Sequence, residues 1–242
     1  MKPFGQLDDP RRRILIQALT AGFFSTPWGA AAQSIFGSAP QRLPPGQSIY
    51  RASGRVLVNS QEATLATRIK PGDVVETAPG GELVFVLAEE AFILRGESRV
   101  VIENPPPSSP LKTALRLATG KLLSVFGRGR PTRIVTATAT IGVRGTGVYA
   151  ESDPEQTYFC TCYGVADIAA NNDLQSKETV SATHHDRPLY ITAKGAAGGR
   201  IRRAPFINHT DQELMLIETL VGRTPPFVFP MNDYNAPRRE YP

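Results

Sequence analysis

Apolar and polar residues alternate in short runs along most of this chain, and the alternation predicts an all-β protein. In the clearest run, between positions 132 and 141, Thr136 and Thr138 fall on one side of the chain and the alanines that follow them fall on the other. A period of two is typical of a strand with one buried and one wet face. The run continues into the glycine-rich segment 142–147, whose glycines permit a bulge or tight bend before the strand resumes.

Other short apolar runs are bounded by turn residues and extend the same pattern. They predict strands at 48–58, 63–68, 74–77, 82–88, 91–94, 98–103, 111–117, 121–126, 148–150, 157–160 and 189–192. Glu89 and Glu90 separate two of these runs and predict the solvated tip of a hairpin. The four prolines of segment 104–110 cannot donate to a sheet ladder, so that segment is expected to be a surface loop between two halves of the sheet.

One segment near the C-terminus has the period of a helix instead. Thr210 is a capping residue, Asp211 and Glu213 place acids in the first turn, and apolar residues follow at helical spacing. Gly222 and the prolines after it end the pattern. The expected helix has about 12 residues and plugs an open end of the β core, covering strand edges there.

The first 33 residues have the features of a secretory signal peptide. A charged patch that ends in Arg11–Arg13 precedes the apolar run 14–24 and the small-residue site Ala30–Ala32. The apolar run is too short to span a bilayer. The Arg11-Arg12 pair favours twin-arginine export, and an arginine-rich Sec signal is the alternative. After cleavage we expect a periplasmic protein that does not span the membrane.

The rest of the chain divides into a lead-in at 34–46, a β domain at 47–200, and a C-terminal helix with a proline-rich tail at 201–242. Its charges are scattered, with 27 lysines and arginines in the whole chain against 22 aspartates and glutamates. A surface that follows nucleic-acid phosphates needs clustered basic residues with interleaved aromatics, and only segment 200–203 approaches that pattern. No nucleic-acid partner is therefore expected.

Several of these motifs resemble the FecR-type periplasmic domain. The segment Ile141–Thr146, reading Ile-Gly-Val-Arg-Gly-Thr, leads through a short strand to an aromatic return strand that ends at Gly164. Upstream, Gly72–Thr77 and Thr119–Leu123 resemble the early turn and the middle strand of that family. The glycine-then-strand units at Gly72, Gly120 and Gly164 hint at stacked similar turns, as in a rolled sandwich or solenoid. With the resemblance, the expectation is a rolled β-sandwich or solenoid-like FecR-type domain with one short C-terminal capping helix.

The resemblance implies a sensor or interaction role with an extracytoplasmic protein partner. FecR-type sensors carry a cytoplasmic segment and a membrane helix ahead of this domain, whereas the features found here are those of a signal peptide. The expectation is therefore an exported, non-catalytic interaction module and not a direct transmembrane signaller. No nucleophile elbow, phosphate-binding glycine loop or helical zinc motif is present, which also argues against an enzyme.

The candidate chemistry lies in Cys160, Cys162, His184 and His185. The two cysteines are the only ones in the chain, and on a strand their thiols point to the same side. Two thiolates and two imidazoles form a standard tetrahedral shell for zinc, and the same soft set holds Cu(I). His209 is a possible substitute ligand, and Asp186 could orient an imidazole.

Other interpretations of these residues remain open at this stage. A Cys160–Cys162 disulfide would be strained at this spacing, but the thiols could be inert buried groups or a redox-active pair. A Cys-His nucleophile is disfavoured on a strand face without a helix N-terminus. In the Arg144-Gly145-Thr146 corner, the arginine could grip a ligand carboxylate or could anchor the bend.

Overall fold

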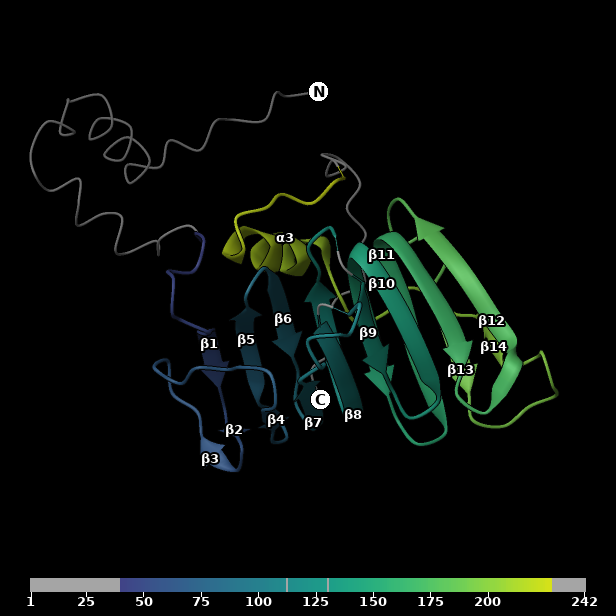
Figure 1. Cartoon of the computed structure of the whole chain (residues 1–242), viewed down its shortest axis with the longest axis horizontal. Coiled ribbons are helices and arrows are strands. Elements are labelled where there is room, and N and C mark those ends of the chain that lie inside the picture. Colours follow the sequence, from purple (N-terminus) through teal and green to yellow (C-terminus); the bar gives the residue numbers. More distant parts are fainter. Residues whose placement is uncertain (1–39, 112, 130, 228–242) are drawn as a thin grey trace, which may run out of the picture. The chain divides into compact units, whose positions relative to one another are not determined.

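The computed structural model describes residues 40–111, 113–129 and 131–227. In this part of the chain, strands dominate and α3 (Asp211–Leu220) is the only helix, so the prediction of an all-β protein is confirmed (Figure 1). The strands are β1 (Ile49–Ser53), β2 (Val56–Val58), β3 (Gln61–Glu62), β4 (Val74–Thr77), β5 (Glu82–Leu87), β6 (Glu90–Leu94), β7 (Ser98–Glu103), β8 (Thr113–Val125), β9 (Thr132–Val135), β10 (Ala139–Ser152), β11 (Gln156–Ala170), β12 (Asp173–Ala182), β13 (Leu189–Thr192) and β14 (Ile201–Arg203).

All the strands join one hydrogen-bonded sheet that branches at its three longest members, β8, β10 and β11. The first half of β8 pairs with β7 and the second half with β6. Likewise, β11 pairs first with β13 and then with β12. Because each long strand exchanges one set of neighbours for another, the sheet folds over into two layers. One layer contains β1, β5, β6 and β13, and the other contains β2, β4, β7, β9 and β12.

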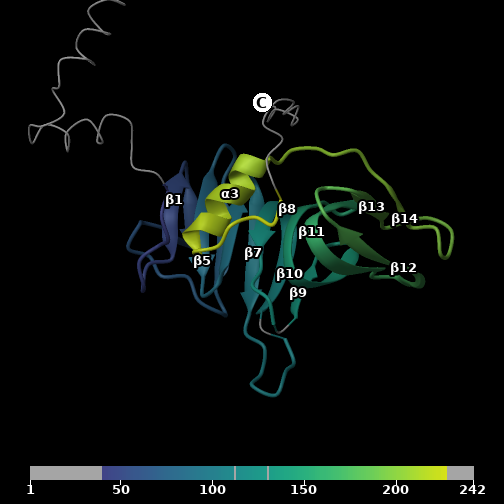
Figure 2. The same cartoon turned by 90° about the horizontal axis from the view of Figure 1, so that it is seen from above.

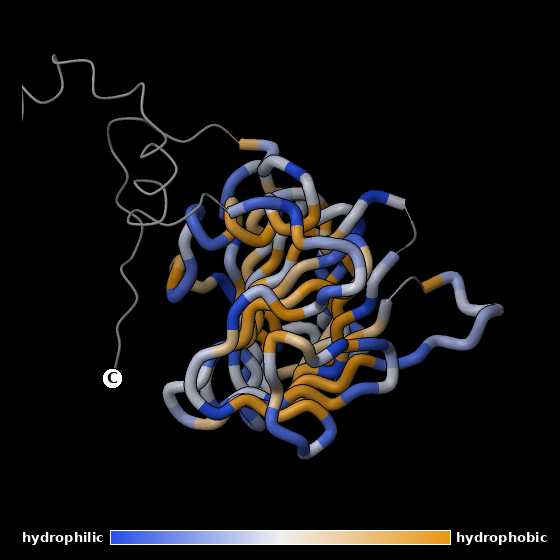
Figure 3. The backbone as a smooth tube through the Cα atoms, turned by 90° about the vertical axis from the view of Figure 1, so that its left-hand side faces the viewer, coloured by the Kyte–Doolittle hydropathy of each residue, from blue (hydrophilic) through white to orange (hydrophobic). Residues whose placement is uncertain are grey.

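Two hydrophobic clusters explain why the central strands are almost continuously apolar in sequence. In β5, Leu83 and Phe85 enter the core between the two layers, whereas Val84 and Val86 point to the outer face of the first layer. Both faces of this layer are therefore buried. Figure 3 shows the hydrophobic residues concentrated in the strands and the hydrophilic ones at the turns.

Helix α3 covers the outer face of the first layer and does not plug an end of the β core. Figure 2 shows α3 lying across this face of the sheet. Its apolar residues Leu214, Ile217 and Leu220 belong to one hydrophobic cluster with the outer side chains of β5, β6 and β8. Both ends of the helix are tied to the ends of β6, by the Arg95–Glu213 ion pair at 2.8 Å and by a hydrogen bond from Arg223 to the Glu89 carbonyl. The predicted Thr210 N-cap is confirmed, with a complete capping box.

The alternating run at 132–141 was interpreted wrongly as one half-wet strand. Residues 136–138 form the turn between β9 and β10, and Thr136 and Thr138 are buried. Their hydroxyls share hydrogen bonds of 2.7 Å with the Thr157 hydroxyl. Threonine can thus occupy the interior here because its hydroxyl is satisfied.

Three further local predictions were wrong. Residues 63–68 form turns and not a strand. Glu90 is not part of a solvated tip, since it lies buried in β6 within hydrogen-bond reach of Thr132. The two strands predicted on either side of Gly120 are the single strand β8, and β12 was not predicted.

The predicted signal peptide at 1–33, most of the predicted lead-in and the tail beyond Phe227 lie outside the described residues. The sheet continues past position 200, because β14 pairs with β13. Among the described residues, no helix is both long and apolar enough to cross a membrane.

Candidate metal centre

The two thiols come from adjacent inward positions of β11. Cys160 and Cys162 are both fully buried and free, and both belong to the cluster beneath α3. As the strand period predicts, they share one side of the strand. They lie in the stretch where β11 passes from its pairing with β13 to its pairing with β12.

His185 reaches these thiols from the turn that follows β12. Its backbone N–H donates to the Cys162 carbonyl at 2.9 Å, which ties the turn to β11. The residue adopts a left-handed conformation with φ of 52°. Asp186 stabilises the same turn by accepting from the backbone N–H groups of Thr183 and His184. It caps the turn and does not orient an imidazole.

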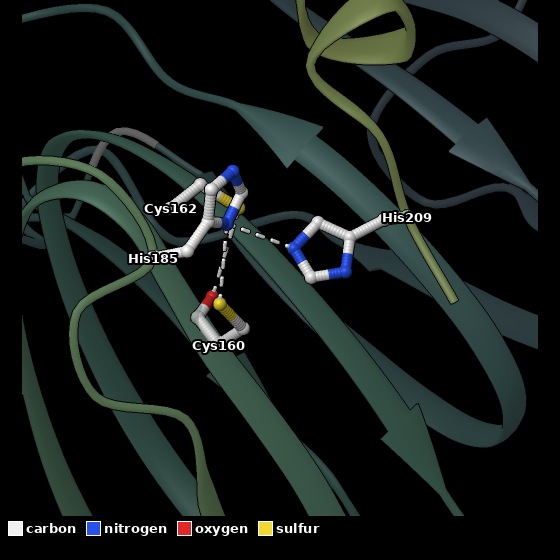
Figure 4. A group of neighbouring side chains, drawn as sticks. All are labelled: Cys160, Cys162, His185 and His209. Atoms are coloured by element: carbon white, nitrogen blue, oxygen red, sulfur yellow. Dashed lines mark hydrogen bonds between the residues drawn. The ribbon is translucent and has the colours of Figure 1, made fainter. Parts of the chain in front are cut away.

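His209 reaches the cluster from the segment that enters α3, one residue before the N-cap Thr210. Its ring is buried and stacks on Tyr149 with a centroid distance of 4.5 Å. The capping box fixes the helix start, and the stacking fixes the ring. The cluster thus unites β11, the turn after β12 and the entry to α3 (Figure 4).

Hydrogen bonds on the far side of each ring set the tautomers of the two imidazoles. His209 Nδ1 lies 2.7 Å from the Ile207 carbonyl, so it carries the proton and leaves Nε2 bare. His185 Nε2 lies 2.9 Å from the Asp211 carboxylate, so it donates there and leaves Nδ1 bare. These two bare nitrogens face each other at 3.1 Å. With both rings neutral, two lone pairs at that distance repel unless a proton or a metal cation stands between them.

The four donor atoms lie close together, and two of the six distances between them match those of a tetrahedral zinc shell. The Sγ atoms of Cys160 and Cys162, His185 Nδ1 and His209 Nε2 all lie within 4.8 Å of one another, and Cys160 Sγ is 3.5 Å from His185 Nδ1. With Zn–S of about 2.3 Å and Zn–N of about 2.0 Å, a regular tetrahedron has S···N edges of about 3.5 Å and N···N edges of about 3.3 Å. The observed spacings of 3.5 and 3.1 Å are close to these values.

The electrostatics of the cluster already favour a thiolate. Burial alone would raise the pKa of the Cys160 thiol, but hydrogen bonds with Cys162, His185 and His209 hold it well below its ordinary value. Burial and the neighbouring Cys160 raise the pKa of Cys162. Burial opposes the charged form of His185, yet its hydrogen bonds to Asp211 and Cys160 raise its pKa to about 9. Without a metal, a proton on His185 therefore balances the Cys160 thiolate, and a metal cation would take its place.

Cys160, His185 and Asp211 also stand in the order of a nucleophile, a base and an orienting carboxylate. Catalysis by such a group requires that a substrate reach the sulfur. Both sulfurs are buried, with Cys160 and Cys162 at 0 % exposure. The same burial prevents the thiol exchange that a redox pair needs. A closed set of four ligands is typical of a structural metal site.

His184 does not join the thiol cluster. Its Nε2 lies 2.9 Å from the second oxygen of Asp211, and its side chain is 38 % exposed. Asp211 thus binds both histidines, and it performs the orienting role that the sequence suggested for Asp186. Hydrogen bonds from these imidazoles lower the Asp211 pKa despite its burial. The available signal was that Asp211 lies two residues from His209, in the first turn of the predicted helix.

The Arg144-Gly145-Thr146 corner forms a bulge in β10, as the glycines predicted. Arg144 is exposed and lies 3.5 Å from Asp167. The Thr146 hydroxyl donates to the carbonyls of Arg144 and Val165, which closes the bend against β11. Thr146 therefore has a structural role in the corner.

Comparison with known proteins found no matching family model and no matching curated protein. Two crystal structures of a candidate anti-sigma factor from Parabacteroides distasonis are similar in fold to part of this chain, with 12 % and 13 % sequence identity. Each match has a TM-score of 0.44 and covers 54 % of this chain and 58 % of the other. This chain therefore matches little more than half the length of those proteins.

Proposed function

We propose that this chain is an exported, non-catalytic interaction module of FecR type, whose C-terminal helix is held on the sheet by a buried zinc ion. The ligands are Cys160, Cys162, His185 and His209. The observation that carries the proposal is the closeness of four donor atoms: two buried sulfurs and two imidazole nitrogens that are 3.1 Å apart, all within 4.8 Å of one another.

Charge favours zinc over Cu(I) at this site. A divalent cation bound by two thiolates and two neutral imidazoles has no net charge, whereas Cu(I) would leave one negative charge in a solvent-free cluster. Uncompensated charge is costly to bury. The closed shell, with all four ligands from the protein, also matches structural zinc and not metal transfer.

The metal would act as a cross-link between distant segments. It joins β11 to the segment that enters α3, about 50 residues further along the chain. Metal binding then contributes directly to folding free energy. Helix α3 covers an apolar sheet face, so holding the helix in place keeps that face from solvent and from unwanted association.

Export and partner binding are supported by sequence features. Residues 1–33 have the arginine pair and apolar run of an export signal. The motifs around Gly72, Gly120 and Ile141–Thr146 resemble FecR-type domains, which meet extracytoplasmic protein partners. Twin-arginine export of a folded chain would load zinc before the thiols meet an oxidising compartment.

Elemental analysis of the purified full-length protein tests the metal. We expect close to one zinc per chain in the wild type and none in Cys160→Ser/Cys162→Ser. The matched control is His184→Ala, since His184 is next to the cluster but outside it, and it should retain zinc. Wild-type protein without metal, or with a Cys160–Cys162 disulfide in most molecules, would overturn the metal assignment.

Cell fractionation tests export separately. We expect the mature chain in the periplasm with its new N-terminus near Gln33, and retention of Arg11→Lys/Arg12→Lys in the cytoplasm. If the wild-type chain stays uncleaved in the cytoplasm, the export proposal fails. Normal export of the double-lysine variant would point to the Sec route instead.

A further inference from the structure

A second site lies beyond the opposite end of α3 from the metal cluster. A partly open pocket of about 760 Å³ is bounded by aromatic and apolar side chains that include Phe126, Tyr163, Val221 and Pro226. Its lining also includes Gly145 and Gly164 of the glycine corner. Charged and hydroxyl side chains make up about half of the lining, and the pocket's volume falls in the range of small-molecule sites.

Three arginines converge on this pocket: Arg42, Arg128 and Arg223. Arg42 and Arg128 are exposed and form no hydrogen bond or ion pair with any other described residue. Arg223 binds the Glu218 carboxylate through Nε at 2.6 Å, but its Nη2 is buried and has no hydrogen-bond partner among the described residues. A buried guanidinium nitrogen without an acceptor is unfavourable and indicates a missing oxygen ligand.

Glycines make room for two of these arginine side chains. A Cβ on Gly145, which has φ of +58°, would lie 2.9 Å from Arg128 Cγ. A Cβ on Gly222, with φ of +73°, would lie 3.1 Å from Arg42 Cδ. Gly145 of the sequence motif thus leaves the space that the side chain of Arg128 occupies, 17 positions earlier in the chain. A larger residue at position 145 would displace this arginine from the pocket wall.

The acidic groups of the pocket leave it positive. Glu89 and Glu218 line it together with the three arginines, and Arg223 binds the Glu218 carboxylate and the Glu89 carbonyl. The Glu218 carboxylate already accepts hydrogen bonds from Tyr163 and Arg223. The acceptor that fits Arg42, Arg128 and the Nη2 of Arg223 is therefore an external oxyanion, since guanidinium groups match carboxylates and phosphates in geometry.

From these observations we infer that the pocket binds a small organic oxyanion with an apolar body. The arginines hold the carboxylate or phosphate group, and the apolar body packs against Phe126 and Tyr163. None of these side chains belongs to the Cys-His cluster, so the anion site can be present whether or not a metal is bound there. The proposed interaction module would therefore also bind a small organic anion.

Isothermal titration calorimetry on the zinc-loaded full chain tests the inference. The probes are phenylacetate, phenyl phosphate, inorganic phosphate and the uncharged phenylacetamide. We expect phenylacetate or phenyl phosphate to bind at least about tenfold more tightly than phenylacetamide, and inorganic phosphate to bind weakly because it lacks the apolar body. Which of the two organic anions binds more tightly identifies the oxyanion.

The anion affinities of two arginine variants, one in the pocket and one outside it, give a matched comparison. Arg42→Ala/Arg128→Ala should lower the affinity at least about tenfold. Arg144→Ala removes a nearby exposed arginine that does not line the pocket, and it should bind as the wild type does. No binding of either organic anion up to about 10 mM overturns the inference, as does equal binding by the double variant. Zinc analysis of each variant separates a folding defect from a lost anion site.

Discussion

The metal cluster and the arginine pocket lie at opposite ends of the same helix, and they differ in access to solvent. Three of the four proposed metal ligands are buried and the fourth, His185, has a side chain only 7 % exposed. The pocket, by contrast, opens beside the end of α3, where Arg42 and Arg128 are exposed. A closed site cannot exchange its contents without unfolding locally, so it suits stability. An open site exchanges freely, so it suits recognition. In our proposal the buried cluster stabilises the fold and the open pocket binds a ligand.

One strand supplies both sites. Cys160 and Cys162 of β11 belong to the cluster, and the next residues, Tyr163 and Gly164, line the pocket. The bulge of β10 opposite this stretch accommodates Tyr163, because a Cβ on Gly147 would lie 2.4 Å from the Tyr163 ring. Gly147 therefore leaves room for Tyr163, so that β11 passes from the buried cluster at Cys162 to the pocket lining at Tyr163 and Gly164.

The largest expected effect is the loss of stability when the Cys-His cluster is disrupted. In Cys160→Ser/Cys162→Ser, loss of the metal cross-link should lower the free energy of unfolding by about 3–5 kcal/mol, and the melting temperature by about 10 °C. Chelator should destabilise the wild type by a similar amount and leave the variant unchanged. Calorimetry checks this, and a chelator effect of equal size in both proteins would contradict it.

Asp211→Asn tests how strongly the second carboxylate supports the metal. The amide should orient His185 less well and reduce the basicity of its ring, so zinc affinity should fall by about 10- to 100-fold. Asp186→Asn changes a carboxylate of the same region that contacts only backbone N–H groups in the turn. Competition with a coloured chelator measures both, and equal losses would remove Asp211 from its orienting role.

A smaller effect is expected at the open site from Gly145→Ala. The added methyl should displace Arg128 and lower organic-anion affinity by about fivefold, because one of three guanidinium contacts is lost. Gly80→Ala carries comparable backbone strain at φ of +69°, but it has nothing within 4 Å of the added Cβ. That control should bind the anion normally, and both variants should retain zinc.

The smallest predicted effect joins the two sites. Chelation should weaken anion binding by about two- to threefold, because Val221 at the C-cap of α3 and Arg223 just beyond it line the pocket, and the proposed metal would hold the other end of the helix. Titration calorimetry before and after chelation measures it. Unchanged affinity would show that the helix C-terminus does not depend on the metal.

Features that depend on local chemistry were predictable from the sequence. The strand period placed Cys160 and Cys162 on one side, the capping box located the start of α3, and the glycines at 142–147 indicated the bulge. In each case the determining contacts lie within a few residues of one another.

Features that depend on distant contacts were not predictable in the same way. The burial of Glu90 depends on β9, and that of Thr136 on Thr157 of the next strand. His209, and not His184, is the second imidazole of the cluster because α3 packs on the sheet face beside the cysteines. The residues next to either histidine in the sequence do not indicate where α3 packs. The sequence also suggested that α3 covers an open end, because an amphipathic helix has the same pattern whether it covers an edge or a face.

X-ray absorption at the zinc edge tests the proposed metal centre most directly. For the purified full-length protein we predict two sulfur ligands at about 2.3 Å and two nitrogen ligands at about 2.0 Å. A zinc shell without sulfur, or protein that binds no zinc while both thiols remain reduced, would contradict the account.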